Sequence, residues 1–300
     1  MADFDVLGLG VAVRDVTVLL ETFPTPDEKY RAKGFFESSG GPVPTALVTL
    51  ARLGRRVAFR GMVGDDAVGE FILDDLRREC VDVAGVVRRK NIPSPSSVIL
   101  VDGGRRTIFE GWQTDLPLSS GDVHLDSCRV LLVDARLPDI QIDWATRARR
   151  AGATVVLDCG HPRPGVEEIL GLTDVAILSH TYPRTFLGEG YDAAKFLIEL
   201  QSHLSPDGRR IAGLTLGPEG CVIQAPGAST LWIPGHKVEA MDSTGAGDVF
   251  HGAFVHSLLA DDAPDVAARF ANAAAALKCR GMTGRAPIPS EKEIRGLAGI

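Results

Sequence analysis

The segment from Asp242 to Asp248 reads DSTGAGD and combines two acidic residues with a turn of small residues. An apolar, helix-like stretch, Val249 to Leu259, follows it directly. The first amides of a helix have no intrahelical partner, and the helix dipole adds positive potential there, so such a turn can hold an anion. The residues small enough to let a phosphoryl group approach are Gly245, Ala246 and Gly247.

Asp248 follows this predicted anion hole directly. A carboxylate beside an anion is unfavourable unless it has a chemical role, and accepting the proton of an attacking hydroxyl is such a role in phosphoryl transfer. The alternative is that Asp242 and Asp248 cap an ordinary turn, because Asp, Ser and Thr favour helix starts. The segment by itself leaves both interpretations open.

The elements that must position this segment form an α/β pattern, in which short apolar runs alternate with amphipathic stretches. We therefore expect a mostly parallel central sheet flanked by helices. The predicted strands are Val6–Leu9, Val57–Val63, Val130–Val133, Thr154–Leu157, Val175–Leu178 and Ile211–Leu216, with a late hairpin over Cys221–Ile233. The predicted helices are Thr45–Leu53, Val68–Glu79, Val249–Leu259 and Asp265–Lys278.

Two stretches, residues 13–39 and 94–111, break this alternation. The second reads as a hairpin that turns at Asp102-Gly103-Gly104. We predict that the two stretches form a small β lid over a substrate site. The α/β core would then comprise residues 1–12, 40–93 and 112–300.

The composition excludes several classes of function. The net charge is -7 and there is no long block of lysine and arginine, so neither nucleic acid nor an anionic membrane surface is an expected partner. The five cysteines are widely spaced and the seven histidines form no HExxH motif, which argues against a disulfide framework and against a metal cage built by the protein. The acidic start and the absence of a long apolar run favour a cytoplasmic protein.

Three motifs, in order along the chain, give a more specific reading. DSTGAGDVFHGAF resembles the carboxy-terminal signature of the ribokinase, or PfkB, family of carbohydrate kinases. SSGGPVPTALVTLARLG with GMVGDDAVGEF resembles the amino-terminal signature, and LTLGPEG resembles the turn on the nucleotide side. Together they span Val6 to Pro289 and imply an enzyme that uses ATP with Mg²⁺ to phosphorylate a small sugar.

The resemblance also assigns roles to residues. It makes Asp248 the catalytic base and the small turn the anion hole. Asp242 matches a position that helps hold the ion in relatives activated by potassium, so K⁺ is a further candidate cofactor. The positions implied around ATP are Thr215, Gly217, Gly220, Gly245 and Asn272, although the glycines also suit any turn.

On the sugar side, the resemblance implies that Asp15 and the pair Gly40-Gly41 hold sugar hydroxyls. Thr45 stands where many relatives carry asparagine. The family's NxxE-type segment is replaced by residues 179–183, SHTYP, so the metal is expected to be held mainly by ATP oxygens and water.

The substrate class is the least constrained part. FILDDLRREC resembles ketohexokinase, and the RFANAAAALKC and GRAPIP segments resemble sulfofructose kinase, so we expect a ketose phosphorylated on a primary hydroxyl. Lys29 and Arg136 could hold an anionic terminus, whereas Glu110 would repel one or pair with Arg136. Sulfofructose kinase activity and a sensor without turnover remain alternatives. Exposed lid edges also predict a homodimer.

Overall fold

The computed structural model describes residues 2–111 and 116–300, so the predicted core boundary at residue 112 lies outside the described residues. Within them, eight strands form one large sheet, and every neighbouring pair in it is parallel except the two that involve its last two strands. These strands are β1 (Phe4–Leu9), β4 (Val57–Arg60), β9 (Cys128–Val133), β10 (Thr154–Cys159), β11 (Val175–Ser179), β12 (Ile211–Thr215), β13 (Gly220–Gln224) and β14 (Leu231–Pro234). Their order across the sheet is β14-β13-β12-β11-β10-β9-β1-β4.

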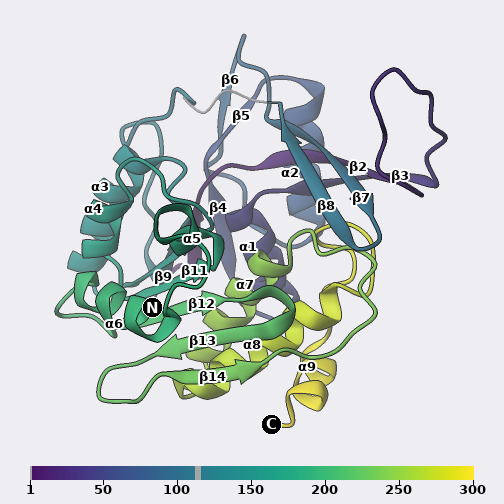
Figure 1. Ribbon diagram of the computed structural model, residues 1–300. Coiled ribbons are helices and arrows are strands. Elements are labelled where there is room, and N and C mark those ends of the chain that lie inside the picture. The colour runs from purple at the N-terminus through teal and green to yellow at the C-terminus, as the bar shows by residue number, and fades with distance from the viewer. Residues whose placement is uncertain (1, 112–115) are drawn as a thin grey trace.

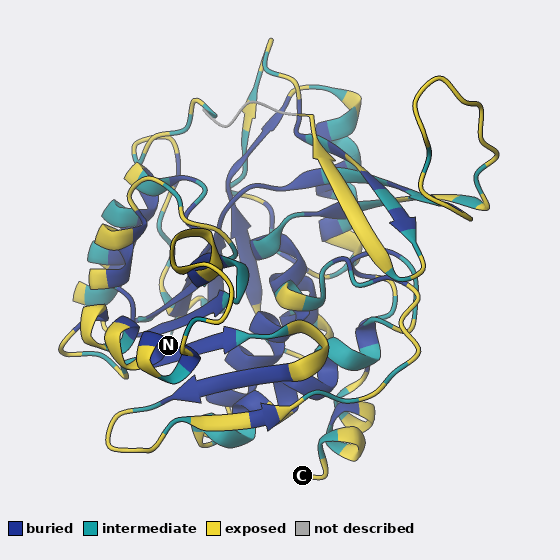
Figure 2. Cartoon of the chain, viewed as in Figure 1, coloured by how far each residue is buried: buried dark blue, intermediate teal, exposed yellow. Residues whose placement is uncertain are grey.

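Helices cover both faces of this sheet, as Figure 1 shows. One face carries α1 (Pro42–Arg52), α2 (Ala67–Arg78), α7 (Ala246–Leu258), α8 (Pro264–Lys278) and α9 (Glu291–Ala298). The other carries α3 (Pro138–Arg150), α4 (Val166–Gly171), α5 (Thr181–Leu187) and α6 (Ala193–His203). The parallel strands between them are mostly buried, because a parallel sheet covered on both sides faces little water, whereas the edge strand β14 is largely exposed (Figure 2). The predicted α/β fold class is confirmed.

A separate small sheet stands beside the large one. Its strands are β2 (Val13–Leu19), β3 (Gly34–Gly40), β7 (Ser96–Asp102) and β8 (Arg105–Glu110), in the order β3-β2-β7-β8. The expected hairpin is present between β7 and β8, because Gly103 and Gly104 both adopt the positive φ that its turn requires. Residues 20–33, between β2 and β3, form a loop that projects away from the body of the molecule (Figure 1).

The prediction of one strand over Val57–Val63 is wrong. The chain forms β4 and then a separate strand, β5 (Met62–Gly64), which leaves the large sheet and pairs with β6 (Val87–Arg89). The break falls at Gly61, where a Cβ atom would lie 2.5 Å from the carbonyl oxygen of Gly10. A side chain at this position would therefore collide with the backbone that follows β1, so the close approach requires glycine.

The carboxyl ends of the parallel strands define where a ligand can bind, since ligands of open α/β sheets lie outside these ends. Asp134 follows β9, and Asp158 lies near the end of β10. The small sheet and the start of α7 meet the same region, because Gly104 of the β7–β8 turn bridges to Asp242. No helix within residues 2–111 and 116–300 is long and apolar enough to cross a membrane.

Candidate active site

The small-residue turn leads directly into α7, as expected. Gly245 adopts a left-handed conformation with φ 75°, and a Cβ atom there would lie 2.7 Å from the carbonyl oxygen of Gly284, so only glycine fits. The predicted set of anion-binding amides needs one correction: the amide of Ala246 already donates to the Ser243 carbonyl at 3.2 Å. Within the described residues, the amides left without a partner at this helix start are those of Gly245, Gly247 and Asp248.

Asp248 lies in the first turn of α7, beside these amides. Burial raises the pKa of its carboxyl, while the charges of His251 and Arg106, followed by those of Arg136 and Arg285, oppose this shift. A raised pKa brings the group closer to neutral pH, where a general base works best. The carboxylate thus has the position and the environment that proton abstraction requires.

His251 lies one turn after Gly247 on α7, and its side chain is almost wholly buried. Nδ1 lies 2.7 Å from the Gly247 carbonyl oxygen and 3.2 Å from Oδ2 of Asp158, while Nε2 lies 2.9 Å from the Ile177 carbonyl oxygen. Burial raises the pKa of Asp158 to about 7, and His251 opposes the shift. The polar contacts of the His251 imidazole therefore link the start of α7 to β10 and β11.

The small sheet also reaches this turn through Arg106, a residue without an assigned role in the sequence interpretation. Nη1 of Arg106 donates to the hydroxyl of Ser243 at 2.9 Å, and that hydroxyl donates to the Gly104 carbonyl at 3.3 Å. The guanidinium is the second strongest of the charges that favour ionised Asp248. The cationic side chain of Arg106 thus lies beside the predicted anion hole.

Asp15 and Gly40 come together as predicted, on the neighbouring strands β2 and β3. A Cβ atom on Gly40 would lie 1.8 Å from Oδ2 of Asp15, so a side chain at this position would displace the carboxylate. Gly41 has φ 102° and faces the Val11 carbonyl closely. Burial raises the pKa of Asp15 to about 7, opposed by Arg285 and reinforced by Asp248.

Arg285 is buried and packs against the double glycine of the predicted sugar site. It donates to the Gly40 carbonyl at 3.3 Å and to the hydroxyls of Ser39 and Thr45, and it pairs with Asp75 at 3.4 Å. Burial lowers its pKa to about 10. Thr45, predicted to bind substrate, is buried with its hydroxyl 3.3 Å from Arg285, so it supports the double glycine instead of facing the cleft.

Glu110 and Arg136 form an ion pair. Glu110 lies at the end of β8, and Arg136 lies just after β9. Both terminal nitrogens of Arg136 lie 3.1 Å from Oε1 of Glu110. Although burial opposes its charge, the carboxylates of Asp134 and Glu110 raise the pKa of Arg136. The charge of Arg136 is therefore already balanced by carboxylates of the chain itself.

Asp134 carries a buried oxygen with no partner among the described residues. Its Oδ1 accepts from the Arg136 amide at 3.1 Å and from Gln141 at 2.9 Å, whereas Oδ2 accepts none. A Cβ atom on Gly10 would lie 2.9 Å from this Oδ2. The carboxylate thus points to the end of β1, next to the predicted sugar site.

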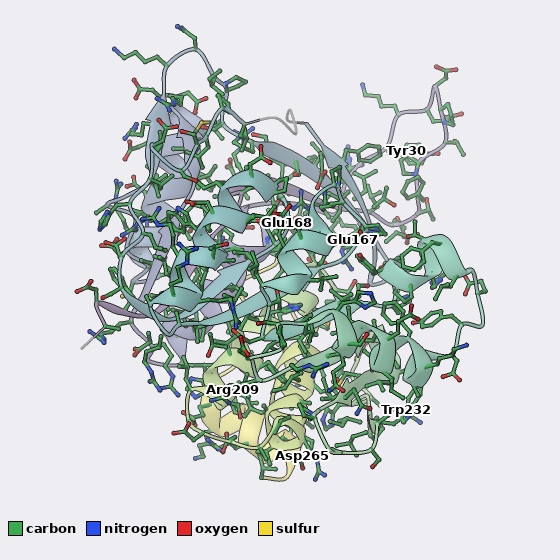
Figure 3. All side chains as sticks on the ribbon, turned by 90° about the vertical axis from the view of Figure 1, so that its left-hand side faces the viewer. Tyr30, Glu167, Glu168, Arg209, Trp232 and Asp265 are labelled. Atoms are coloured by element: carbon green, nitrogen blue, oxygen red, sulfur yellow. The ribbon has the colours of Figure 1, made fainter. Side chains whose placement is uncertain are left out.

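Lys29 is not brought to the cleft. It lies on the exposed loop of residues 20–33, which projects from the small sheet, and the neighbouring Tyr30 marks this loop at the edge of the molecule in Figure 3. Lys29 was predicted to hold an anionic terminus together with Arg136. The loop instead carries it outward.

The residues predicted to flank ATP lie on and beside the β12–β13 hairpin. Thr215 ends β12, Gly217 starts a short 3₁₀ turn over Gly217–Glu219, and Gly220 begins β13. Gly220 has φ 103° and touches the backbone of β14, so its conformation is required by the hairpin. Asn272 on α8 is buried, and its Nδ2 donates to the Pro234 carbonyl at 2.8 Å, which fixes the end of β14.

Asp242 is fully buried and does not face the cleft. One carboxylate oxygen accepts from the Thr244 amide at 2.8 Å and the other from the Thr283 amide at 2.9 Å. For divalent metals, the described part of the chain contains no group of three or more His, Cys, Asp or Glu that could hold an ion. The SHTYP segment spans the end of β11 and the start of α5 and offers only hydroxyl, imidazole and phenol groups.

A family model described as pfkB family carbohydrate kinase matches residues 4–291. The chain belongs to the PfkB family of carbohydrate kinases. The curated relatives of this PfkB chain include a ribokinase from Haemophilus influenzae, 26% identical over 296 residues and covering 95% of each chain. The family assignment makes the protein an ATP-dependent carbohydrate kinase, that is, a phosphotransferase with an alcohol group as acceptor, and so disfavours the alternative of a sensor without turnover.

Solved structures agree with this assignment. A protein from Agrobacterium tumefaciens described as a candidate ribokinase is 27% identical, with a TM-score of 0.85 and coverage of 98% of this chain and 97% of that one. Arabidopsis thaliana ribokinase, solved in complex with ribose and ATP, is 23% identical, with a TM-score of 0.81 and full coverage of both chains, and it supports the fold.

Proposed function

We propose that this PfkB kinase phosphorylates a small neutral sugar, in first place a fructose-like ketose, at a primary hydroxyl. The observation that carries the proposal is the pairing of Glu110 with Arg136 at 3.1 Å. An anionic sugar would have to displace a carboxylate to reach Arg136, and Lys29, the second predicted anion ligand, lies outside the cleft. The pairing therefore disfavours sulfofructose, whereas neutral hydroxyls can bind carboxylates directly.

The chemistry follows from the two ends of the cleft. Asp15 and the backbone at Gly40-Gly41 would hold the sugar hydroxyls, and Asp248 would accept the proton of the attacking hydroxyl. The hydroxyl oxygen then forms a bond to the γ-phosphorus while the bond from that phosphorus to the bridging oxygen of ADP breaks. The free amides at the start of α7, with Arg106 beside them, would stabilise the negative charge of the phosphoryl oxygens in the transition state.

ATP would bind along the β12–β13 hairpin and α8, with Thr215, Gly217 and Gly220 beside it. Asn272 contributes by fixing the end of β14. Mg²⁺ bound together with ATP would supply neutralisation of the phosphate charge. Because no carboxylate lies in the SHTYP segment, the ligands of Mg²⁺ would be mainly ATP oxygens and water.

The family resemblance makes Asp242 a candidate ligand of K⁺. However, both oxygens of this carboxylate already accept amide hydrogen bonds, and the backbone carbonyl of Asp242 accepts one from a lysine ammonium. We therefore do not include K⁺ among the cofactors of the proposed reaction.

The small sheet would act as a lid and as a dimer interface. Asp15 and Glu110 lie on its inner face, while the outer face exposes Phe35 (72%), Phe109 (54%) and Val98 (43%). Val98 and Phe109 are direct cross-strand partners, so they form a continuous apolar surface beside two unpaired strand edges. A second copy of this sheet is the proposed partner. Light scattering should report a dimer for the native chain and a monomer for Phe35→Asp.

The substrate proposal is tested by ADP release with a panel of acceptors. The panel contains fructose, ribose, glucose, a nucleoside and sulfofructose, each with MgATP. We expect the highest kcat/KM with a neutral ketose. The named ribokinase relatives make ribose the competing acceptor, and a clear preference for ribose would replace the ketose while retaining the neutral site. A preference for sulfofructose would contradict the role given to Glu110.

A further inference from the structure

The last residue of α8, Lys278, is a lysine with no exposed surface. Its Nζ donates a hydrogen bond to the backbone carbonyl of Asp242 at 2.8 Å. Lysine is almost never fully buried without a partner, because its ammonium group loses its hydration. Lys278 therefore needs a compensating charge nearby. Asp242, which is far from Lys278 in the sequence but in contact with it, is the candidate.

Asp242 supplies that charge. Burial lowers the pKa of Lys278, and among the charges that oppose this shift Asp242 is the strongest, with Asp248 a weaker contributor. In turn, a buried carboxylate requires a nearby cation or several hydrogen bonds. Asp242 has two amide hydrogen bonds and a lysine ammonium at its own carbonyl.

This arrangement lies directly under the anion-binding turn. Asp242 begins the segment that ends at Asp248, and its carboxylate holds the Thr244 amide, one residue before Gly245. The other oxygen holds the Thr283 amide, in the loop that packs against Gly245 through Gly284. A cation at this place therefore helps to keep the turn in position.

We propose that Lys278 is a positioning residue whose ammonium group takes the place of a monovalent cation beside the anion hole. A primary ammonium and K⁺ are similar in size and both bind carbonyl oxygens. Since Lys278 already occupies the Asp242 carbonyl, a second cation at this buried site would be repelled. The hydroxyl of Thr244, which has no partner within the described residues, is neutral and leaves this charge balance unchanged.

The inference rests on the proposed anion hole but not on the identity of the sugar. Its first test uses the native enzyme, with any acceptor found in the panel, in KCl, NaCl and choline chloride at equal ionic strength. We expect kcat to differ by less than about twofold among the three salts, because the cation is part of the chain. A strong activation by K⁺ over choline would overturn the proposal.

The second test removes the ammonium. Lys278→Ala should lose roughly tenfold or more in kcat, as expected when an outer support of a reactive site is lost. KCl and methylammonium chloride should each restore part of this activity in a saturable manner, whereas choline chloride should not. Both salts should also raise the melting temperature of this variant above its value in choline chloride, a readout that does not depend on turnover.

Lys292→Met provides the control, since Lys292 is exposed on α9. It should match the native enzyme in all salts. Lys278→Met retains the length of the side chain without its charge and separates loss of charge from loss of packing. Full activity of Lys278→Met in choline chloride would contradict the role of the ammonium, even if Lys278→Ala were too unstable to assay.

Discussion

The two ends of the cleft are built differently. The phosphate end uses backbone amides and one carboxylate from a single segment, Asp242 to Asp248. The sugar end uses side chains that come from β2, β8 and the segment after β9, namely Asp15, Glu110 and Arg136. A site made of consecutive backbone groups depends on local conformation, whereas a site made of distant side chains depends on how the whole chain folds.

The two ends also differ in charge. At the phosphate end the positive groups, Arg106 and the free amides, face the place where phosphoryl charge develops. At the sugar end carboxylates predominate, and Arg136 is balanced by Glu110 and Asp134. In the proposed reaction, positive potential acts at one end and hydrogen-bond acceptors act at the other, and four substitutions test this contrast.

Asp248→Asn should have the largest effect. Asparagine keeps the shape of the side chain but cannot accept the proton, so kcat should fall roughly 10²- to 10⁴-fold while ATP binding persists. Single-turnover kinetics and isothermal titration with an ATP analogue measure the two quantities. Asp139→Asn, on the exposed start of α3, serves as the control, and retained turnover by Asp248→Asn would remove the base from the mechanism.

Arg106→Ala should have the next largest effect. Loss of a cation that faces the transferring group should lower kcat by on the order of 10²-fold with little change in the KM for the sugar. Arg105→Ala is a matched control, because Arg105 is adjacent on β8 and also exposed, but its side chain pairs with Asp102 among the described residues, whereas that of Arg106 donates to Ser243. Equal losses in both variants would show that the hairpin as a whole, not the Arg106 charge, matters.

Asp15→Asn should act on the sugar end and on stability in opposite directions. Losing a charged acceptor should raise the KM for the sugar roughly tenfold. In the native enzyme the same KM should rise as the pH falls through about 7, since protonation of Asp15 removes that acceptor. The substitution should flatten this part of the pH profile.

The stability effect of Asp15 follows from its raised pKa. The folded chain holds this proton up to about pH 7, whereas in the unfolded chain the carboxyl has its ordinary pKa of 3.8, so the carboxyl destabilises the fold increasingly as the pH rises between these values. Asp15→Asn should therefore raise the melting temperature more at pH 8 than at pH 5. An equal change at both pH values would contradict the burial of this charge.

Glu110→Gln should have the smallest effect, because the Glu110 side chain is partly exposed and such ion pairs contribute little. Releasing Arg136 from its partner should improve kcat/KM for an anionic sugar by a few-fold relative to a neutral one. Glu37→Gln, on the other edge of the same small sheet, is the control. An unchanged preference would place Glu110 outside the substrate site.

The different construction of the two ends explains what the sequence could predict. The turn, the place of Asp248 at the start of α7 and the α/β order could be predicted from the sequence, because each depends on neighbouring residues. Asp134 and Asp158 also carry a sequence signal, because each is a carboxylate near the end of a predicted parallel strand. The contacts of Arg106, Arg285 and Lys278 could not be predicted from the sequence, since each side chain contacts a residue at least 36 positions away. Lys29 was misplaced because the length of a loop does not give its direction.

Arg285 and the loop before it have a consequence for how the enzyme is made. The Gly40 carbonyl accepts a hydrogen bond from Arg285, and the Asp242 carboxylate accepts one from the Thr283 amide. Both donors come late in the sequence. During synthesis, a nascent chain could fold most of its sheet and still lack the supports of both binding sites. Catalytic competence would then appear only after residues 283–285 have been synthesised, so that chains terminated before them could not consume ATP.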